Sequence, residues 1–89
     1  MTHRLSGQLI CANAAEAARV RRYLPDHIAL SRAQPGCLSF DVTPTADPLI
    51  WQVEETFLDR ASFEAHQQRS RASVWFAQTA SIKRVYQIA

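Results

Sequence analysis

The stretch SRAQPGCLSF, residues 31–40, predicts a place where a helix ends and a strand begins. Pro35 disfavours the helical conformation for the residue before it, and Gly36 tolerates the backbone that a chain reversal demands. After this turn, Leu38 and Phe40 alternate with small or polar residues, as expected of a half-buried strand. We therefore expect a helix before the turn and a strand directly after it.

The segment before the turn predicts a short strand over residues 5–11 and then a helix that begins at Asn13. Asn13 can accept hydrogen bonds from the first-turn amides, while the Glu16 side chain reaches back to the Asn13 amide. Apolar residues then recur at spacings of three and four and form one buried stripe: Ala17, Val20, Leu24 and Ile28. Because Pro25 lies inside this segment, we expect either one kinked helix or two short ones.

The segment after the turn predicts two strands, then helical residues, then a last strand. The expected ranges are strands 37–43 and 49–57, a helix over 60–68 capped by Asp59, a helical continuation over 71–81 that Ser70 could cap, and a strand over 82–88. The third strand has two distinct faces: Trp51, Val53, Glu55 and Phe57 on one, and Ile50, Gln52, Glu54 and Thr56 on the other.

The order strand, helix, strand, strand, helix, strand is the split βαβ pattern of the α+β, ferredoxin-like class. In this pattern an antiparallel sheet carries its helices on one face, and the other face stays open. The residues of the third strand on that open face are Ile50, Gln52, Glu54 and Thr56, and their mixed polarity is typical of an interface. We therefore expect a homodimer in which two open sheet faces pack together.

Length and composition indicate one globular domain over residues 1–89. The chain has 89 residues, of which 47% are hydrophobic and 20% charged, and a domain of this size buries only about 60% of its unfolded surface. Sharing a core with a partner would add to so small a core. The net charge is +2, and the basic clusters around Arg21 and Arg69 have no interleaved aromatic residues, so we expect no nucleic-acid binding.

The cysteines and glycines argue against a bound cofactor. Cys11 and Cys37 lack the spacing of metal ligands, and Gly7 and Gly36 are too few for a dinucleotide loop. We expect no metal, haem or flavin. No apolar run approaches the roughly 20 residues that cross a bilayer, and the N-terminal residues lack the apolar core of a signal peptide. The expectation is a cytoplasmic protein without membrane contact.

Two segments, HIALSRAQPGCLSF at 27–40 and WQVEETFLDRASFEAH at 51–66, resemble the antibiotic biosynthesis monooxygenase superfamily. The similarity extends from about residue 5 to about residue 88. It implies a dimeric α+β barrel, and it covers quinol monooxygenases, haem-degrading enzymes and isomerases. The haem-degrading branch has an Asn in the first strand where this chain has Ser6. Many members have a second histidine five residues after the one matching His66, and this chain has Arg71 there.

His66, His27 and Glu55 are the candidate catalytic residues. His66 follows Phe63 by three residues, so both should face the sheet, where the third strand can present Glu55. The imidazole then serves either as a general base, with an expected pKa near the ordinary 6.5, or as a structural hydrogen bond between helix and sheet. His27 lies beside the apolar stripe of the first helix and either enters the same cavity or stays partly exposed.

Aromatic and basic residues around this position are candidate walls of a substrate cavity, each with ordinary core or surface packing as its alternative. The substrate-binding candidates are Phe40, Trp51, Phe63, Arg71, Trp75 and Phe76. Trp75 and Phe76 point about 100° apart on a helix, so only one can face the cavity squarely. Arg84 and Tyr86 share one face of the last strand, whose direction the sequence leaves open.

These residues and the resemblance together predict a cofactor-independent monooxygenase or oxidase of a quinol-like or phenolic small molecule. An electron-rich phenolate can itself reduce oxygen, so the protein needs a base, a dry cavity and donors for the developing charge. The alternatives are a non-catalytic small-molecule binding or stress-response protein and an isomerase of a small carbonyl compound.

Overall fold

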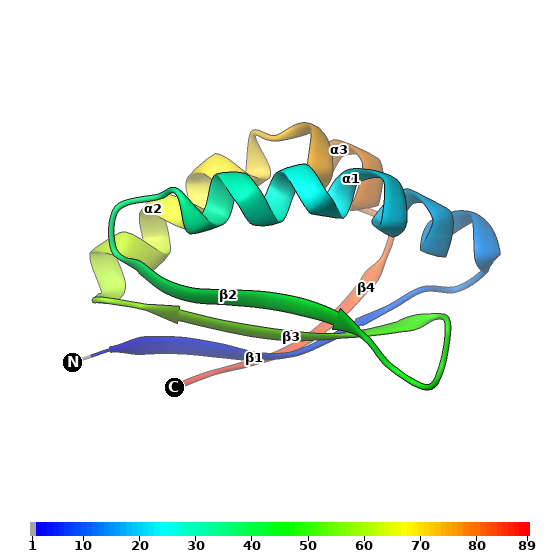
Figure 1. Cartoon of the computed structure of the whole chain (residues 1–89), viewed down its shortest axis with the longest axis horizontal. Helices are drawn as coiled ribbons and strands as arrows, with labels where there is room; N and C mark the ends of the chain where they lie inside the picture. The colour runs from blue at the N-terminus through cyan, green and yellow to red at the C-terminus, as the bar shows by residue number, and fades with distance from the viewer. Residues whose placement is uncertain (1) are drawn as a thin grey trace.

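A four-stranded antiparallel sheet is covered on one face by three helices in the computed structural model, which describes residues 2–89 (Figure 1). The elements are β1 (His3–Ile10), α1 (Ala14–Arg32), β2 (Cys37–Pro44), β3 (Ile50–Phe57), α2 (Arg60–Arg71), α3 (Val74–Thr79) and β4 (Lys83–Ile88). The strand order is β2-β3-β1-β4, and every neighbouring pair is antiparallel. This is the predicted ferredoxin-like α+β fold.

The first helix is a single element that continues through Pro25. Asn13 caps it as predicted, because its Oδ1 accepts a hydrogen bond from the Glu16 amide at 3.0 Å. The Glu16 side chain also reaches back, but its Oε1 accepts from the Ala12 amide at 2.7 Å and not from the Asn13 amide. Of the two expectations for this segment, the one with two short helices was wrong.

The turn after α1 has the predicted glycine conformation but alters the strand that follows. Gly36 has a φ of 84°, and a Cβ at this position would clash with Ser62 Oγ. In the ladder with β3, Cys37 pairs with Phe57 and Ser39 with Thr56, so Leu38 is the extra residue of a β-bulge. Leu38 is 55% exposed, and the expectation that it shares the buried face of Phe40 was therefore wrong.

The second helical segment is divided into α2 and α3. Asp59 caps α2 as predicted, with its Oδ1 accepting from the Ser62 amide at 2.8 Å. The cap of α3 is Ser73, whose Oγ accepts from the Phe76 amide at 3.2 Å, and not Ser70 as expected. Ser70 lies in the last turn of α2, where its carbonyl accepts from the Ser73 hydroxyl at 2.6 Å.

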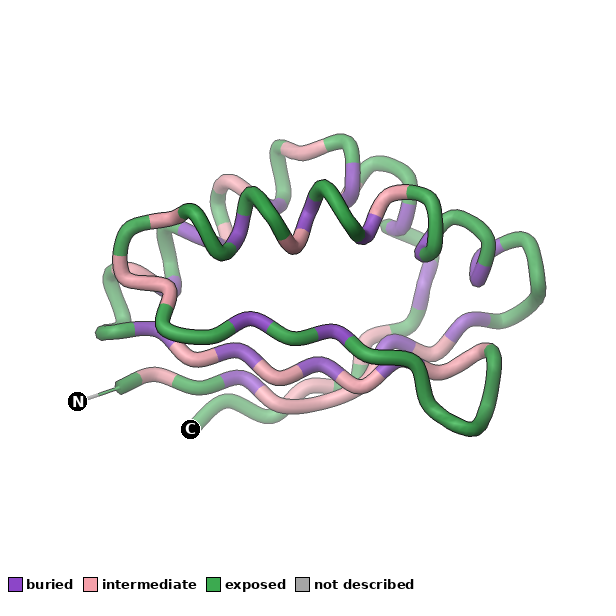
Figure 2. The backbone as a smooth tube through the Cα atoms, viewed as in Figure 1, coloured by how far each residue is buried: buried purple, intermediate pink, exposed green. Residues whose placement is uncertain are grey.

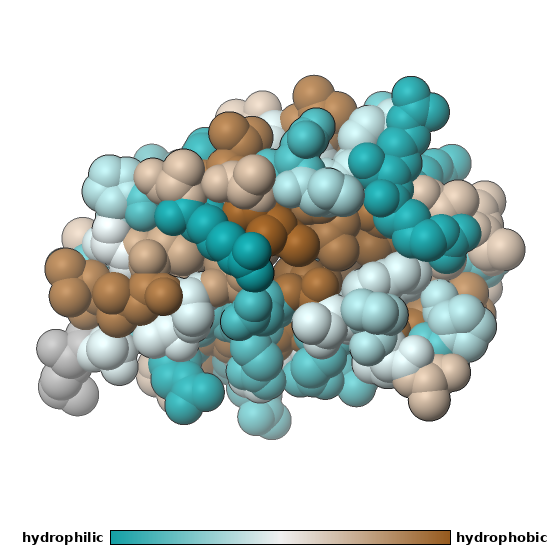
Figure 3. Space-filling view, viewed as in Figure 1, coloured by the Kyte–Doolittle hydropathy of each residue, from teal (hydrophilic) through white to brown (hydrophobic). Residues whose placement is uncertain are grey.

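The core lies between the sheet and the helices. Buried and half-buried positions alternate along β3, as the two-residue period of a strand requires (Figure 2). Residues on the helix-facing side are buried, whereas Ile50, Gln52, Glu54 and Thr56 on the other side are only partly covered. On the side shown in Figure 3, apolar side chains come to the surface between α1 and β2, and hydrophilic side chains cross over them. In the described part of the chain no helix is long and apolar enough to span a bilayer.

Candidate active site

A cavity of about 170 Å³ lies between the sheet and the helices α2 and α3. Five elements (β1, β3, α2, α3 and β4) and the C-terminal half of α1 contribute to its wall. The polar and aromatic lining residues are His27, Glu55, His66, Gln67, Ser70, Arg71, Trp75, Phe76, Arg84 and Tyr86. All three predicted catalytic residues thus meet at one cavity, although they lie on three different elements.

Glu55 is the acidic residue of this cavity. It lies on the helix-facing side of β3, where alternation along the strand directs it inward, and it is 7% exposed. Its Oε1 is buried and has no hydrogen-bond partner. Because burial disfavours the charged form, the pKa of Glu55 rises to about 7. A carboxyl group with this pKa can take or give a proton at neutral pH.

His66 on α2 is oriented by two polar neighbours. Its Nδ1 lies 2.8 Å from Gln34 Oε1, and because an amide oxygen only accepts, Nδ1 carries the proton. Nε2 is therefore the unprotonated nitrogen, and it lies 3.6 Å from Glu55 Oε1. The gap is slightly too long for a hydrogen bond, so both atoms remain available to a third group.

The pKa of His66 differs from the expected value. The expectation of an ordinary pKa near 6.5 was wrong, because burial and the nearby Arg69 cation lower the pKa of His66 to about 4. An opposite charge on Glu55 would favour the imidazolium, but the side chain is only 2% exposed and we take desolvation to dominate. The resting pair at neutral pH is therefore a neutral imidazole beside a carboxyl group that is about half protonated.

His27 enters the cavity from α1. Its ring stacks on Trp75, with centroids 4.9 Å apart and an interplanar angle of 12°, and meets the Phe40 ring edge-on at 5.4 Å. His27 Nδ1 is buried and has no hydrogen-bond partner. Burial, with the charges of His66, Arg69 and Arg84, lowers the pKa of His27 to about 3. His27 is thus a neutral ring that lines the cavity and has one buried, unpaired nitrogen.

The Arg84 and Tyr86 side chains of β4 face the cavity, a direction that the sequence left open. Tyr86 pairs with Gly7 of β1, and a Cβ at Gly7 would clash with the Val85 backbone oxygen and lie 2.7 Å from Tyr86 Cδ1, so the absent side chain makes room for the β4 backbone and the phenol ring. Burial raises the pKa of Tyr86 to about 12. Arg84 lies on the same face, and its guanidinium donates to Thr79 O at 2.8 Å, Ile82 O at 3.1 Å and Thr79 Oγ1 at 2.9 Å.

The predicted wall residues divide into two groups. Trp75, Phe76 and Arg71 line the cavity, with Trp75 buried and Phe76 partly covered. The other three are not among its lining residues. Phe40 packs behind the histidines, 5.3 Å from the His66 ring; Phe63 packs on Phe57 at 5.7 Å; and Trp51 is core, paired with Leu9 in the ladder. Sequence periodicity identified which side chains face inward, but not which of them lie at the cavity and which lie elsewhere in the core.

Sequence reasoning missed Gln34 as part of the site, did not assign Tyr86 to it, and placed Arg69 only in a basic cluster. Arg69 is partly buried, and its Nη2 donates to Ser31 Oγ at 2.9 Å, which joins α2 to α1. The signal for Gln34 was its place directly before the Pro–Gly turn, where a residue leaves the helix. Nothing local in the sequence pairs it with a histidine 32 residues away.

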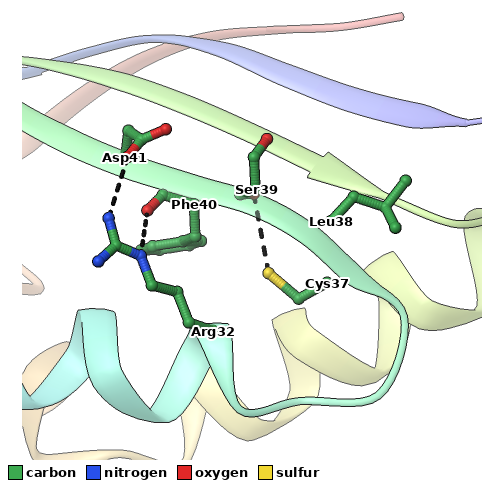
Figure 4. Close-up of a pocket in the computed structure, with 6 residues that line it drawn as sticks. All are labelled: Arg32, Cys37, Leu38, Ser39, Phe40 and Asp41. Atoms are coloured by element: carbon green, nitrogen blue, oxygen red, sulfur yellow. Dashed lines mark hydrogen bonds and ion pairs between the residues drawn. The ribbon is translucent and has the colours of Figure 1, made fainter.

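A second hollow, of about 370 Å³, lies at the start of β2 and is drawn in Figure 4. Arg32 crosses it from α1, and its guanidinium donates to Phe40 O and Asp41 Oδ1, both at 3.0 Å. Cys37 also lines it, and burial raises the pKa of that thiol. The charged groups here satisfy one another, in contrast to the unpaired Glu55 and His27 atoms. The smaller cavity is therefore the better candidate site.

This arrangement can remove a proton from a small ligand and stabilise the resulting anion. It combines a buried carboxyl group with a pKa near neutrality, a neutral imidazole and two cationic arginines. In the described residues, no three His, Cys, Asp or Glu side chains come together as metal ligands. These features define a class: a ferredoxin-like α+β protein with a small, polar cavity between its helices and its sheet.

Comparison with known proteins gives the family within this class. The profile of the antibiotic biosynthesis monooxygenase (ABM) family matches residues 10–78. The chain belongs to the antibiotic biosynthesis monooxygenase family. No curated protein sequence matches it.

Solved structures with the same fold include three from bacteria. They are Rv0793 from Mycobacterium tuberculosis (TM-score 0.81, 19% identity, 100% of this chain and 93% of that chain covered), a candidate antibiotic biosynthesis monooxygenase from Nitrosomonas europaea (0.86, 18%, 99% and 88%) and SnoaB, a cofactor-independent oxygenase from Streptomyces nogalater (0.82, 10%, 99% and 90%). At these identities the similarity establishes the fold alone.

Proposed function

We propose that this protein is a cofactor-independent monooxygenase or oxidase of a phenolic or quinol-like small molecule. The observation that carries the proposal is the Glu55 carboxyl group, which is buried, unpaired at Oε1 and shifted to a pKa of about 7 beside His66 Nε2. Such a group is matched to proton abstraction at neutral pH. Family membership and the oxygenase name of SnoaB support the same reaction class.

In the proposed reaction, ionised Glu55 takes the phenolic proton, with His66 Nε2 as its neighbour in the proton transfer. Arg71 and Arg84 line the cavity, and their positive charge stabilises the anionic substrate. The phenolate then gives electrons to molecular oxygen. As an oxidase, the protein converts a quinol and one oxygen molecule to a quinone and hydrogen peroxide; as a monooxygenase, it gives a hydroxyquinone and water. Both equations balance without a further reductant.

Oxygen consumption tests this proposal directly. Metal-stripped protein is mixed with a panel of small quinols, and oxygen uptake, peroxide and product are followed by electrode and mass spectrometry. We expect uptake above the spontaneous rate, with its loss in the Glu55→Gln variant. Uptake that returns only with added metal, or that is equal in wild type and variant, would contradict the proposal.

Isomerisation of a small carbonyl compound is a second candidate, because the same pair suits proton removal beside a carbonyl group. This reaction needs no oxygen. Turnover of a carbonyl substrate under nitrogen would favour the isomerase, whereas a bound ligand with no turnover under either gas would indicate a binding protein.

We also propose a homodimer through the open face of the sheet. Its middle strands carry partly covered residues, and Glu54 Oε1 accepts from Ser6 Oγ at 2.8 Å and from Gln52 Nε2 at 3.1 Å. Val85 on β4 is 47% exposed on the same face. Light scattering should give twice the chain mass at micromolar concentration, and Gln52→Arg should shift the protein toward monomer because each copy would bring a like charge to the interface. A wild-type monomer would contradict this.

A further inference from the structure

Three arginines gather at the cavity without a carboxylate partner. Arg71 and Arg84 line it, and Arg69 lies beside His66. Within residues 2–89 the arginines that form ion pairs are Arg32, with Asp41, and Arg60, with Glu64. Arg84 and Arg69 donate only to neutral oxygens, those of Thr79, Ile82 and Ser31. The cavity therefore carries positive charge that the protein does not neutralise.

The single acidic group among the lining residues offsets little of this charge. Burial raises the pKa of Glu55 to about 7, so near neutral pH it carries on average only part of a negative charge. Cations in a poorly solvated site are stabilised by a ligand of opposite charge. The two lining arginines suit this role differently, since Arg84 is held by three hydrogen bonds while Arg71 is exposed and free to move onto a ligand.

Cavity size limits the ligand to one ring. The volume is about 170 Å³, and a cavity of about 150 Å³ is known to hold one benzene molecule. Trp75, Phe76 and Tyr86 provide aromatic walls suited to a flat ring. By the same comparison, a fused two-ring ligand would fit only if the walls moved.

We propose that the substrate is a monocyclic aromatic anion, a hydroxylated benzoate, whose carboxylate binds Arg71 and Arg84 while its hydroxyl group faces Glu55 and His66. The register of the sheet supports this orientation. Leu5 pairs with both Glu55 and Ile88, whereas Arg84 pairs with Leu9, four residues along β1. Glu55 and Arg84 thus lie at opposite ends of this stretch of β1, and Tyr86, which pairs with Gly7, lies between them. In the proposed complex the substrate ring lies over Tyr86. This inference rests on the proposed function, because it names the substrate of the same site.

The test compares gentisate, a dihydroxybenzoate, with gentisamide, its neutral amide of nearly the same shape, and with a two-ring dihydroxynaphthoate. Binding is measured under nitrogen by calorimetry, so that no oxidation occurs. We expect gentisate to bind about tenfold or more tightly than gentisamide, because a charged hydrogen-bonded pair is lost in the amide. The naphthoate should bind more weakly than gentisate.

Arg71→Gln and Arg60→Gln form a matched pair of variants. Both remove one positive charge from α2, but Arg60 pairs with Glu64 and does not line the cavity. Arg71→Gln should weaken gentisate binding about tenfold and leave gentisamide unchanged, and Arg60→Gln should change neither. Equal binding of acid and amide, or an equal loss in both arginine variants, would overturn the inference.

Oxygen uptake separates this inference from the proposed function. If gentisate binds with the expected preference but no phenol or quinol is oxidised, the ligand class stands and the monooxygenase proposal fails. If neutral quinols are oxidised and gentisate has no advantage in binding, the reaction stands and the anionic substrate is wrong.

Discussion

The layer between helices and sheet has two halves of different character. The apolar half contains Leu9, Ala17, Val20, Trp51 and Ile82, all 5% exposed or less. The polar half contains His27, Glu55 and His66, which are also buried at 7% exposed or less, together with Gln34. Both halves use the same strands and the same helix α1. Since burying unpaired polar groups costs stability, the unpaired atoms of the polar half do not serve folding, which agrees with the proposed ligand binding and proton transfer.

Glu55→Gln best separates a catalytic role of the polar half from a structural one. We expect turnover to fall by about 10²-fold to 10⁴-fold, the usual contribution of a general base. Above pH 7 the variant should be more stable by up to about 3 kcal/mol, because the wild type pays to ionise a group whose pKa is about 7 in the fold and 4.5 without it. Steady-state kinetics and urea unfolding at pH 8 measure both.

Glu64→Gln is the matched control, because Glu64 is an exposed carboxylate of α2. It should leave turnover unchanged. If Glu55→Gln lowered stability and left turnover intact, the polar half would be structural, as the apolar half is.

Leu9→Ala and Leu5→Ala compare the halves within one strand. Both leucines are 1% exposed, but Leu5 lines the cavity and Leu9 does not. Leu9→Ala should lower the free energy of unfolding toward the upper end of the usual range of about 2–5 kcal/mol, because it creates a closed void. Leu5→Ala should cost less, since it enlarges a space that already exists, and it should improve binding of a two-ring ligand. Urea unfolding and ligand titration test this, and identical effects of the two variants would contradict it.

Acidification should lower the free energy of unfolding through the titratable groups of the polar half. His27 and His66 have pKa values of about 3 and 4 in the fold, so between pH 5 and pH 5.5 the unfolded chain binds nearly two protons that the fold excludes. Glu55 acts oppositely, because the fold holds a proton that the unfolded chain has lost. The net difference is one proton, and stability should fall by about 1.4 kcal/mol per pH unit on acidification in this window.

Removing the carboxyl group should change that slope. In Glu55→Gln only the two histidines contribute, so the loss of stability should steepen to about 2.7 kcal/mol per pH unit over the same window. Urea unfolding at a series of pH values gives both slopes. A slope that is the same in the variant would show that Glu55 is ionised throughout.

Gln34→Met should have the smallest effect. It keeps the length of the side chain and removes the oxygen that accepts from His66 Nδ1. Loss of one neutral hydrogen bond of about 1.4 kcal/mol corresponds to about tenfold in turnover if the tautomer matters. Nitrogen NMR of the imidazole should show a mixture of tautomers in place of the Nδ1-protonated form. Gln68→Met, at an exposed position of the same helix as His66, should show neither change.

Local rules predicted most of the fold but less of the site. The cap residues Asn13 and Asp59 and the alternation along β3 act over a few residues, and each was correctly read from the sequence. The inward direction of Glu55 and His66 followed from the same periodicities. Leu38 was misplaced because a bulge changes the register, which depends on the facing strand β3.

Side-chain spacing and turn chemistry are enough to predict the order of elements, the faces of the strands and helices, and the meeting of helix α2 with strand β3. The packing of the whole chain was needed to show that Gln34 fixes the tautomer of His66, that Gly7 makes room for Tyr86, and that Trp51 is core. It also decided which group titrates near neutrality, since burial raises the pKa of Glu55 and lowers that of His66. The physical reason is that desolvation and contacts between distant segments depend on how the whole chain packs, which no local pattern specifies.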